Sequence, residues 1–67
     1  MNIPKSLKAA YELRDKKQKD LASGINTANS YVSAIERSIK QAPIGFIQKC
    51  ANFFDMKVSE FIKLGED

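Results

Sequence analysis

The sequence contains no histidine and no tryptophan, and its only cysteine is Cys50. A single cysteine excludes a disulfide within the chain, and without histidine a zinc site is not expected, because zinc sites combine several cysteine and histidine ligands. Acid–base and nucleophilic catalysis also lack candidates, since Cys50 falls on an apolar helix face and no acidic residues pair at helical spacing beside a cleft. We therefore expect no catalytic site, no metal, no cofactor and no small-molecule ligand.

Long apolar runs are missing as well. No segment approaches the roughly 20 apolar residues that cross a membrane, and the start, Met1-Asn-Ile-Pro4, does not resemble a signal peptide. We expect a soluble, cytoplasmic protein without a membrane partner. The sequence predicts a single domain over residues 1–67, and a chain of this size buries only about 60% of its unfolded surface. Helix packing or self-association must therefore supply its stability.

The net charge of +3 is unevenly distributed along the chain. Residues 1–20 hold six basic and three acidic side chains, whereas the last thirteen residues hold four acidic and two basic ones. The segment between them, residues 21–54, has three basic residues against one acidic residue. One end is mildly basic and the other acidic, which suits an anionic partner that approaches one side.

Apolar residues recur at helical spacing nearly throughout, and no segment alternates with period two for long enough to form a strand. The first helix is expected to include Pro4, which suits a first turn, and to end near residue 14. Further helices are predicted at about 16–25, at about 28–38, from Pro43 to Phe54, and from Val58 to about 64. The predicted fold class is therefore all-α, a compact bundle of five short helices.

Short polar residues mark the expected helix ends. Asp15 and Gln18 have the spacing of a capping box that would open the second helix. Asn26 tolerates the left-handed conformation that ends helices, and Thr27 would then cap the third helix. Asp55 is a second expected left-handed stop. The core face of the fourth helix is expected to consist of Ile44, Ile47, Cys50, Ala51 and Phe54.

The third predicted helix has an unusual outward face. At 100° per residue, its core stripe consists of Ala28, Val32, Ile35 and Ile39. The opposite arc holds short neutral residues, with cations towards its end: Asn29, Ser30, Ser33, Ala34, Arg37 and Lys40. Short amides and hydroxyls permit close approach, and the major groove of B-DNA admits one helix and displays a hydrogen-bonding pattern that such side chains can read. Taken alone, this face is also compatible with an ordinary solvated surface.

A family pattern matches these residues and extends further along the chain. The segment Gln18-x-x-Leu21-Ala22-x-x-Ile25-Asn26-Thr27-x-x-Ser30-Tyr31-Val32-Ser33-x-Ile35-Glu36-Arg37 resembles the helix-turn-helix of the lambda-repressor/Cro-type (XRE) family. That family typically has Gln-x-x-Leu-Ala-x-x-Leu-Gly-Val and then Ser-Tyr-Ile-Ser-x-Ile-Glu-Arg. A second segment, Ala51-x-x-Phe54-Asp55-Met56-x-Val58-Ser59-Glu60-Phe61-Ile62, is similar to the family's Ala-x-x-Leu-Gly-Val-x-Leu-Ser-Glu-Leu-Leu. The ungapped similarity covers residues 18–62.

The resemblance implies a lambda-repressor-like domain with its helix-turn-helix at about 16–38. It implies that the third helix contacts DNA bases through Asn29, Ser30, Ser33, Ala34 and Arg37. It also implies phosphate contacts for Gln18 and Lys40, and the position of Lys17 and Lys19 beside the expected turn predicts further phosphate contacts there. The alternatives are that Gln18 serves only a capping box and that the lysines form a solvated run.

Three departures from the family pattern bear on the structure. Asn26 and Asp55 replace glycines after the second and fourth helices, and both tolerate positive φ, so the turns are expected to form. Tyr11 replaces an arginine that often pairs with the family's glutamate at the position of Glu36. Either the Tyr11 hydroxyl bonds Glu36, or that support is absent. Pro43 lies one residue later than usual, so the family gives less guidance on the loop before it.

Three remaining side chains have structural interpretations. Cys50 is expected to be an inert part of the core. Phe46 falls off the main apolar stripe, and a contact within the monomer is favoured over a dimer contact. Tyr31 is expected to pack against the second helix rather than stack on a base.

The function implied by the resemblance is that of a sequence-specific regulator that binds double-stranded DNA. A small repressor of the Cro type would act in the cytoplasm of a bacterial or phage-infected cell, at the nucleoid. Palindromic operators place two half-sites about 34 Å apart, so we predict a homodimer on DNA. The expected dimer interface consists of Val58, Phe61, Ile62 and Leu64. The alternatives are an antitoxin-like module that binds a protein, and an adaptor that kept the fold but lost DNA binding.

Overall fold

The computed structural model describes residues 2–66, and within them all regular secondary structure is helical. Five helices follow in chain order: α1 (Ile3–Arg14), α2 (Gln18–Gly24), α3 (Asn29–Glu36), α4 (Ile44–Phe53) and α5 (Val58–Lys63). This confirms the predicted all-α bundle of five short helices. Pro4 lies in the first turn of α1, as predicted.

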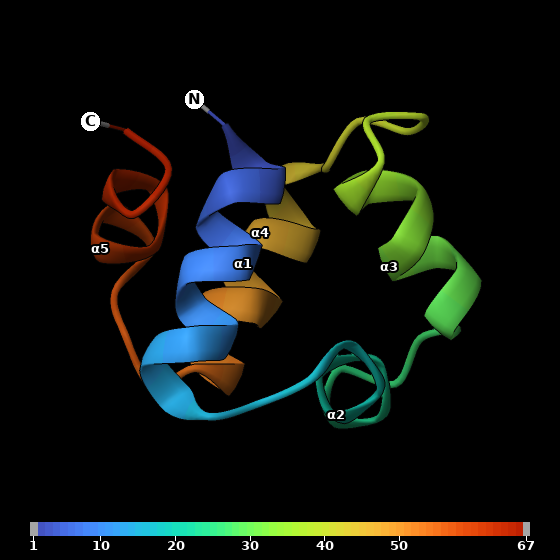
Figure 1. Ribbon diagram of the computed structural model, residues 1–67, viewed down its shortest axis with the longest axis horizontal. Helices are drawn as coiled ribbons and strands as arrows, with labels where there is room; N and C mark the ends of the chain where they lie inside the picture. The colour runs from blue at the N-terminus through green and yellow to red at the C-terminus, as the bar shows by residue number, and fades with distance from the viewer. Residues whose placement is uncertain (1, 67) are drawn as a thin grey trace.

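Helix α1 occupies the middle of the bundle, with α4 behind it, α5 on one side and α2 and α3 on the other (Figure 1). Helix α1 packs against α3 and α5, while α4 packs against α5 and α2. The two ends of the described chain lie together, and a side chain added at Gly65 would meet the backbone oxygen of Asn2. Helices α2 and α3 form the side of the molecule opposite α5 (Figure 1).

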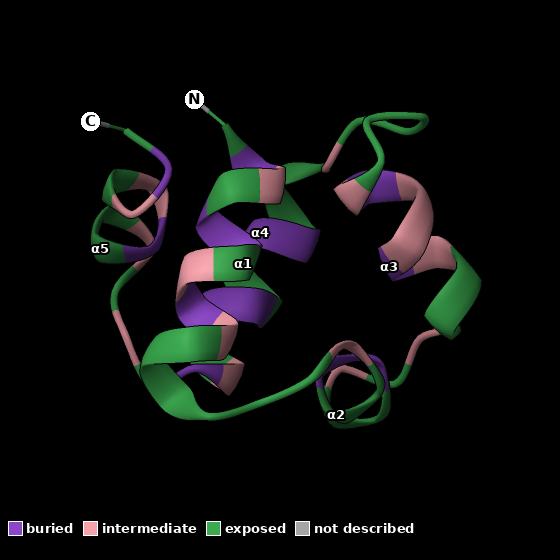
Figure 2. Ribbon diagram, viewed as in Figure 1, coloured by how far each residue is buried: buried purple, intermediate pink, exposed green. Residues whose placement is uncertain are grey.

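The core lies between the facing turns of α1 and α4 and receives one face of each other helix (Figure 2). Phe54 is at its centre, with ring centroids 5.8 Å from Tyr11, 5.1 Å from Phe53 and 6.1 Å from Phe61. Helix α1 buries Ile3, Leu7 and Ala10, and the predicted core face of the fourth helix is buried at Ile47, Cys50, Ala51 and Phe54. Aromatic packing of this kind buries much apolar area in a small chain that has no disulfide.

Three residues predicted to face the core are exposed instead. Ile39 is 69% exposed because α3 ends at Glu36 and the chain turns away at Ser38, so Ile39 never continues the helical stripe. Ile44 is 64% exposed because it begins α4, where the helix projects beyond the core. Ala28 is exposed because it precedes the first turn of α3 as its N-cap.

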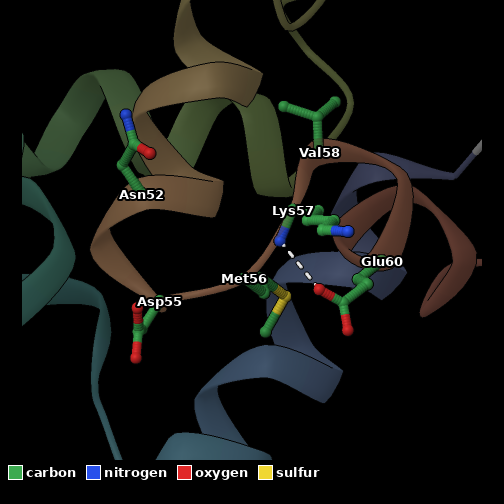
Figure 3. A pocket seen from close by; sticks show the side chains of 6 residues that line it. All are labelled: Asn52, Asp55, Met56, Lys57, Val58 and Glu60. Atoms are coloured by element: carbon green, nitrogen blue, oxygen red, sulfur yellow. Dashed lines mark hydrogen bonds between the residues drawn. The ribbon is translucent and has the colours of Figure 1, made fainter.

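The predicted start of α2 is also wrong. Asp15 does not cap α2, because its left-handed backbone, with φ 55°, ends α1 instead. Helix α2 begins at Gln18, and the carboxylate of Asp20 accepts a 3.0 Å hydrogen bond from the backbone N–H of Lys17. Gln18 therefore has no part in a capping box. Helix α5 uses the same device, since Glu60 accepts from the backbone N–H of Lys57 at 2.9 Å (Figure 3).

The two predicted left-handed stops are present, at Asn26 and Asp55, each with φ 57°. The prediction for Thr27 is wrong, because α3 has Ala28 at its N-cap and no side-chain cap bond. Arg14 plays a part that the sequence patterns did not indicate. Its Nε donates to the carbonyl oxygen of Phe54 at 2.8 Å, so the last turn of α1 satisfies an acceptor at the end of α4.

Candidate nucleic-acid interface

The candidate interface is built on the pair α2 and α3, which a tight turn joins. Leu21 and Ala22 are buried on α2, and the two helices pack directly against each other. The turn is closed by backbone bonds from Ile25 to the oxygen of Leu21 and from Thr27 to the oxygen of Ala22, both 2.9 Å long. With Asn26 left-handed between them, this connection sets α3 across α2 at the surface.

Helix α3 turns its apolar residues inward and its short polar residues outward. Val32 and Ile35 are buried, whereas Asn29, Ser30 and Arg37 are exposed. Ser33 and Ala34 are half-buried, so they lie at the edge of the outward face. Asn29 and Ser30, which open α3, are exposed (Figure 2), and their side chains are too short to keep another surface at a distance.

A hydrogen bond from α1 supports α3 from behind. The Tyr11 hydroxyl donates to Oε2 of Glu36 at 2.6 Å. Burial raises the pKa of Tyr11 above its usual range, and the adjacent Glu36 carboxylate raises this pKa further. Of the two alternatives left by the sequence, the support is therefore present and Tyr11 supplies it.

The segment after α3 does not continue the helix. Ser38 is left-handed, with φ 60°, and the backbone N–H groups of Ile39 and Lys40 both donate to the oxygen of Ala34, at 2.9 and 3.2 Å. Lys40 consequently lies beside α3, with its Nζ 5.6 Å from the ring centroid of Tyr31. Lys40 thus starts at the last turn of α3, as expected, but its ammonium returns along the helix towards Tyr31 because the chain reverses at Ser38.

The predicted phosphate contacts of α2 lie around its first turn. Lys17 is the N-cap and Lys19 the second helical residue, and both are exposed. Gln18 opens the helix and is half-buried. These three residues therefore lie just before α3 in the chain, on the same side of the molecule (Figure 1).

The C-terminal residues predicted as a dimer interface are differently placed from one another. Phe61 is 0% exposed and packs on Phe54, so it has no surface to offer a second copy. Val58, Ile62 and Leu64 are half-buried and pack against the core.

Phe46 and Cys50 both belong to the core. Phe46 is 5% exposed and meets Tyr31 edge-on, which confirms the favoured contact within the monomer. The ring partner of Tyr31 is Phe46 of α4. Burial raises the pKa of the Cys50 thiol to about 12, with a smaller contribution from Glu36, so this thiol is protonated at neutral pH.

The surface pockets of the described residues are shallow, and none of them gathers a set of side chains suited to catalysis or metal binding. One lies at the connection between α4 and α5, where the carboxylate of Glu60 is already used to cap α5 (Figure 3). Within residues 2–66 no group of three or more histidine, cysteine, aspartate and glutamate side chains could hold a metal ion. None of the helices in this range is long and apolar enough to cross a membrane.

Comparison with known families gives one match. A family model described as helix-turn-helix matches residues 7–61, which is most of the chain and includes α2, the turn and α3. Neither the curated proteins nor the solved structures gave a match. Together with the five-helix bundle and the geometry of α2 and α3, the family match establishes that this chain belongs to the helix-turn-helix family of DNA-binding domains, of the lambda-repressor/Cro (XRE) type.

Proposed function

We propose that the protein is a sequence-specific transcriptional regulator of the Cro or repressor type that inserts α3 into the major groove of double-stranded DNA. One observation carries the proposal: the exposed face of α3 has only short neutral side chains, at Asn29 and Ser30, until the cation Arg37 at its end. Amides and hydroxyls on short stems can hydrogen-bond base edges, and arginine can bond guanine edges or phosphates. Ser33 and Ala34 would contribute at the edge of this face.

Cations around this face would supply the phosphate contacts. Lys17 and Lys19 stand at the first turn of α2, and Lys40 stands beside α3. Gln18, at the start of α2, would add a neutral phosphate contact. Contacts to phosphate position a protein on the duplex and make its affinity depend on salt, whereas contacts to bases specify the sequence.

A symmetric operator would be bound by two copies of the chain. One such module has a small contact area, and paired half-sites about 34 Å apart match a two-fold dimer. The proposed interface keeps Val58, Ile62 and Leu64 and omits Phe61, which is buried within the monomer. The regulator would act at the nucleoid, in the cytoplasm of a bacterial or phage-infected cell.

Selection of bound sequences from random duplexes, followed by a salt titration on the selected site, tests the proposal. We expect a palindromic consensus. Arg37→Ala should lower affinity and reduce the slope of log K against log salt by roughly 0.9 if Arg37 contacts one phosphate. Lys57→Ala is the matched control, because Lys57 is an exposed cation at the start of α5. Failure to enrich any sequence, or equal effects of both substitutions, would contradict the docking of α3.

A second candidate is an antitoxin-like or adaptor module that binds a protein. It is favoured by Leu13, Ile39 and Ile44, three large apolar side chains that are exposed in the monomer. Co-expression with the product of a neighbouring gene, followed by purification of a defined complex, would support it. Ile39→Ser and Ile44→Ser should then weaken that complex. Enrichment of a specific DNA sequence by the chain alone would contradict the adaptor.

A further inference from the structure

The ammonium of Lys40 lies over the face of the Tyr31 ring, with 5.6 Å between Nζ and the ring centroid. This distance is within the roughly 6 Å at which a cation is attracted by the electrons of an aromatic ring. Lys40 is exposed and Tyr31 half-buried, so the pair lies at the surface beside α3.

Backbone hydrogen bonds in the loop after α3 fix the position of the Lys40 backbone. Ser38 reverses the chain in the left-handed conformation, and its N–H donates to the oxygen of Ile35 at 3.1 Å. The next two N–H groups, of Ile39 and Lys40, converge on the oxygen of Ala34. The Lys40 backbone is therefore attached to the last turn of α3, and its side chain returns along the helix towards Tyr31.

The ring under Lys40 is anchored in turn. Tyr31 meets Phe46 with 5.7 Å between ring centroids and 73° between ring planes, an edge-to-face arrangement. Phe46 belongs to α4 and to the buried core. The cation thus rests on a ring that core packing holds, not on a freely rotating surface side chain.

A flexible lysine loses rotamer freedom when it binds a phosphate, and this loss weakens binding. A lysine that is held beside the helix in the free protein has lost part of that freedom already. When a helix lies in the major groove, cations at its flank face the phosphates along the groove wall. Lys40 is at such a flank of α3, next to the residues proposed to contact bases.

We propose that Tyr31 is a positioning residue for DNA binding, because its ring holds the Lys40 ammonium beside α3 for contact with a backbone phosphate. This proposal rests on the proposed function of α3 as the helix that enters the groove. Tyr31 itself is not proposed to touch a base.

The contact can be tested first in the free protein, by NMR without DNA. Ring currents should move the signals of the Lys40 methylene protons next to Nζ upfield. The upfield shift should be retained in Tyr31→Phe, which keeps the ring, and lost in Tyr31→Leu, which removes it. Lysine signals at ordinary positions in the wild type would overturn the proposed contact, whatever the protein binds.

Its role in binding can be tested by a double-mutant cycle on the selected duplex. Tyr31→Leu should weaken binding about two- to fivefold when Lys40 is present, the range expected of an exposed cation–π contact, and much less in the Lys40→Gln background. Lys40→Gln should reduce the salt slope by roughly 0.9. Tyr31→Phe should bind like the wild type, which also covers the case that Tyr31→Leu does not fold.

Arg37→Gln serves as the matched control, because Arg37 is another exposed cation of this surface. Its effect should simply add to that of Tyr31→Leu. Additive effects of Tyr31→Leu and Lys40→Gln in a wild-type protein that binds DNA would overturn the positioning role alone. A wild type that binds no duplex at any salt concentration would overturn the proposed function, and the positioning role with it.

Discussion

The hydroxyl of Tyr11 is the donor that links α1 to the last residue of α3. Glu36 places a carboxylate at the C-terminal end of that helix, where the helix dipole disfavours negative charge. The family's usual arginine would neutralise this charge, whereas Tyr11 provides one short hydrogen bond and no positive charge. Arg37 therefore follows a residue, Glu36, whose carboxylate is held by the neutral Tyr11 hydroxyl and not by a cation.

Replacement of Tyr11 by phenylalanine tests this support. The half-buried carboxylate of Glu36 would lose a donor of the kind that stabilises charged acceptors by about 1.5–3 kcal/mol. We expect Tyr11→Phe to lower the free energy of unfolding by an amount in this range, measured by urea denaturation at neutral pH. Glu36→Gln in the same background measures the coupling between the two residues. If the two substitutions are additive, the hydrogen bond contributes nothing.

The raised pKa of Cys50 predicts how the free energy of unfolding changes at alkaline pH. Its pKa is about 12 in the folded protein against 9.0 ordinarily, so the unfolded chain loses the thiol proton first. The stabilising contribution is complete below pH 9 and is lost as pH rises towards 12, by up to about 1.4 kcal/mol per pH unit. Burial also raises the pKa of Tyr11, so the free energy of unfolding falls further above pH 10 for the same reason. Urea unfolding at several pH values should give a shallower decline in Cys50→Ala, and an equal decline would contradict the assignment.

At the scale of elements, the apolar pattern predicted all five helices, but several ends fell elsewhere. Among residues 2–66, four non-glycine residues are left-handed, and only Asn26 and Asp55 could be expected from the family's glycines. Asp15 looked like an N-cap because acidic residues favour both N-caps and positive φ, and the local pattern does not decide between them. Ser38 carries no such signal, because serine is not among the residues that favour positive φ, and backbone bonds to Ile35 and Ala34 close the reversal there.

Replacement of a helical glycine by alanine is expected to have opposite effects on stability at Gly24 and at Gly45. A Cβ at Gly24, in the last turn of α2, would collide with the Phe53 ring, whereas a Cβ at Gly45 in α4 would meet nothing within 4 Å. Alanine favours helix over glycine by about 1 kcal/mol. We therefore expect Gly45→Ala to raise the melting temperature. Gly24→Ala should lower it and weaken DNA binding, since α2 must move from α4. A rise in both variants would mean that Phe53 yields freely.

At the scale of the whole molecule, residues 2–66 form one small bundle whose proposed DNA-binding surface centres on the helix pair α2 and α3. The outward face of α3 could be predicted because it depends only on residues within one helix and on the family pattern. The place of Lys40 could not, because it depends on a non-local arrangement of the Ser38 reversal, the Tyr31 ring and the Phe46 support. The apolar spacing of α5 is compatible with either a core or an interface position for Phe61, and its packing on Phe54 decides for the core.

The proposed dimer on an operator depends on the surface of the whole molecule, and α5 is its proposed interface. Ile62 of α5 is half-buried, so Ile62→Lys should disturb a C-terminal interface, whereas Phe61→Lys would unfold the monomer. We expect the Ile62→Lys variant to bind an isolated half-site normally. On the full palindrome it should lose cooperativity, as measured by gel shift and by analytical ultracentrifugation of the complex.

Ile39→Lys is the control for this experiment, because Ile39 is exposed beside α3 and lies outside α5. If Ile39→Lys abolishes cooperativity and Ile62→Lys does not, the copies meet through the loop between α3 and α4. The proposed interface would then be wrong, while the docking of α3 would stand, because half-site binding does not depend on how the copies meet.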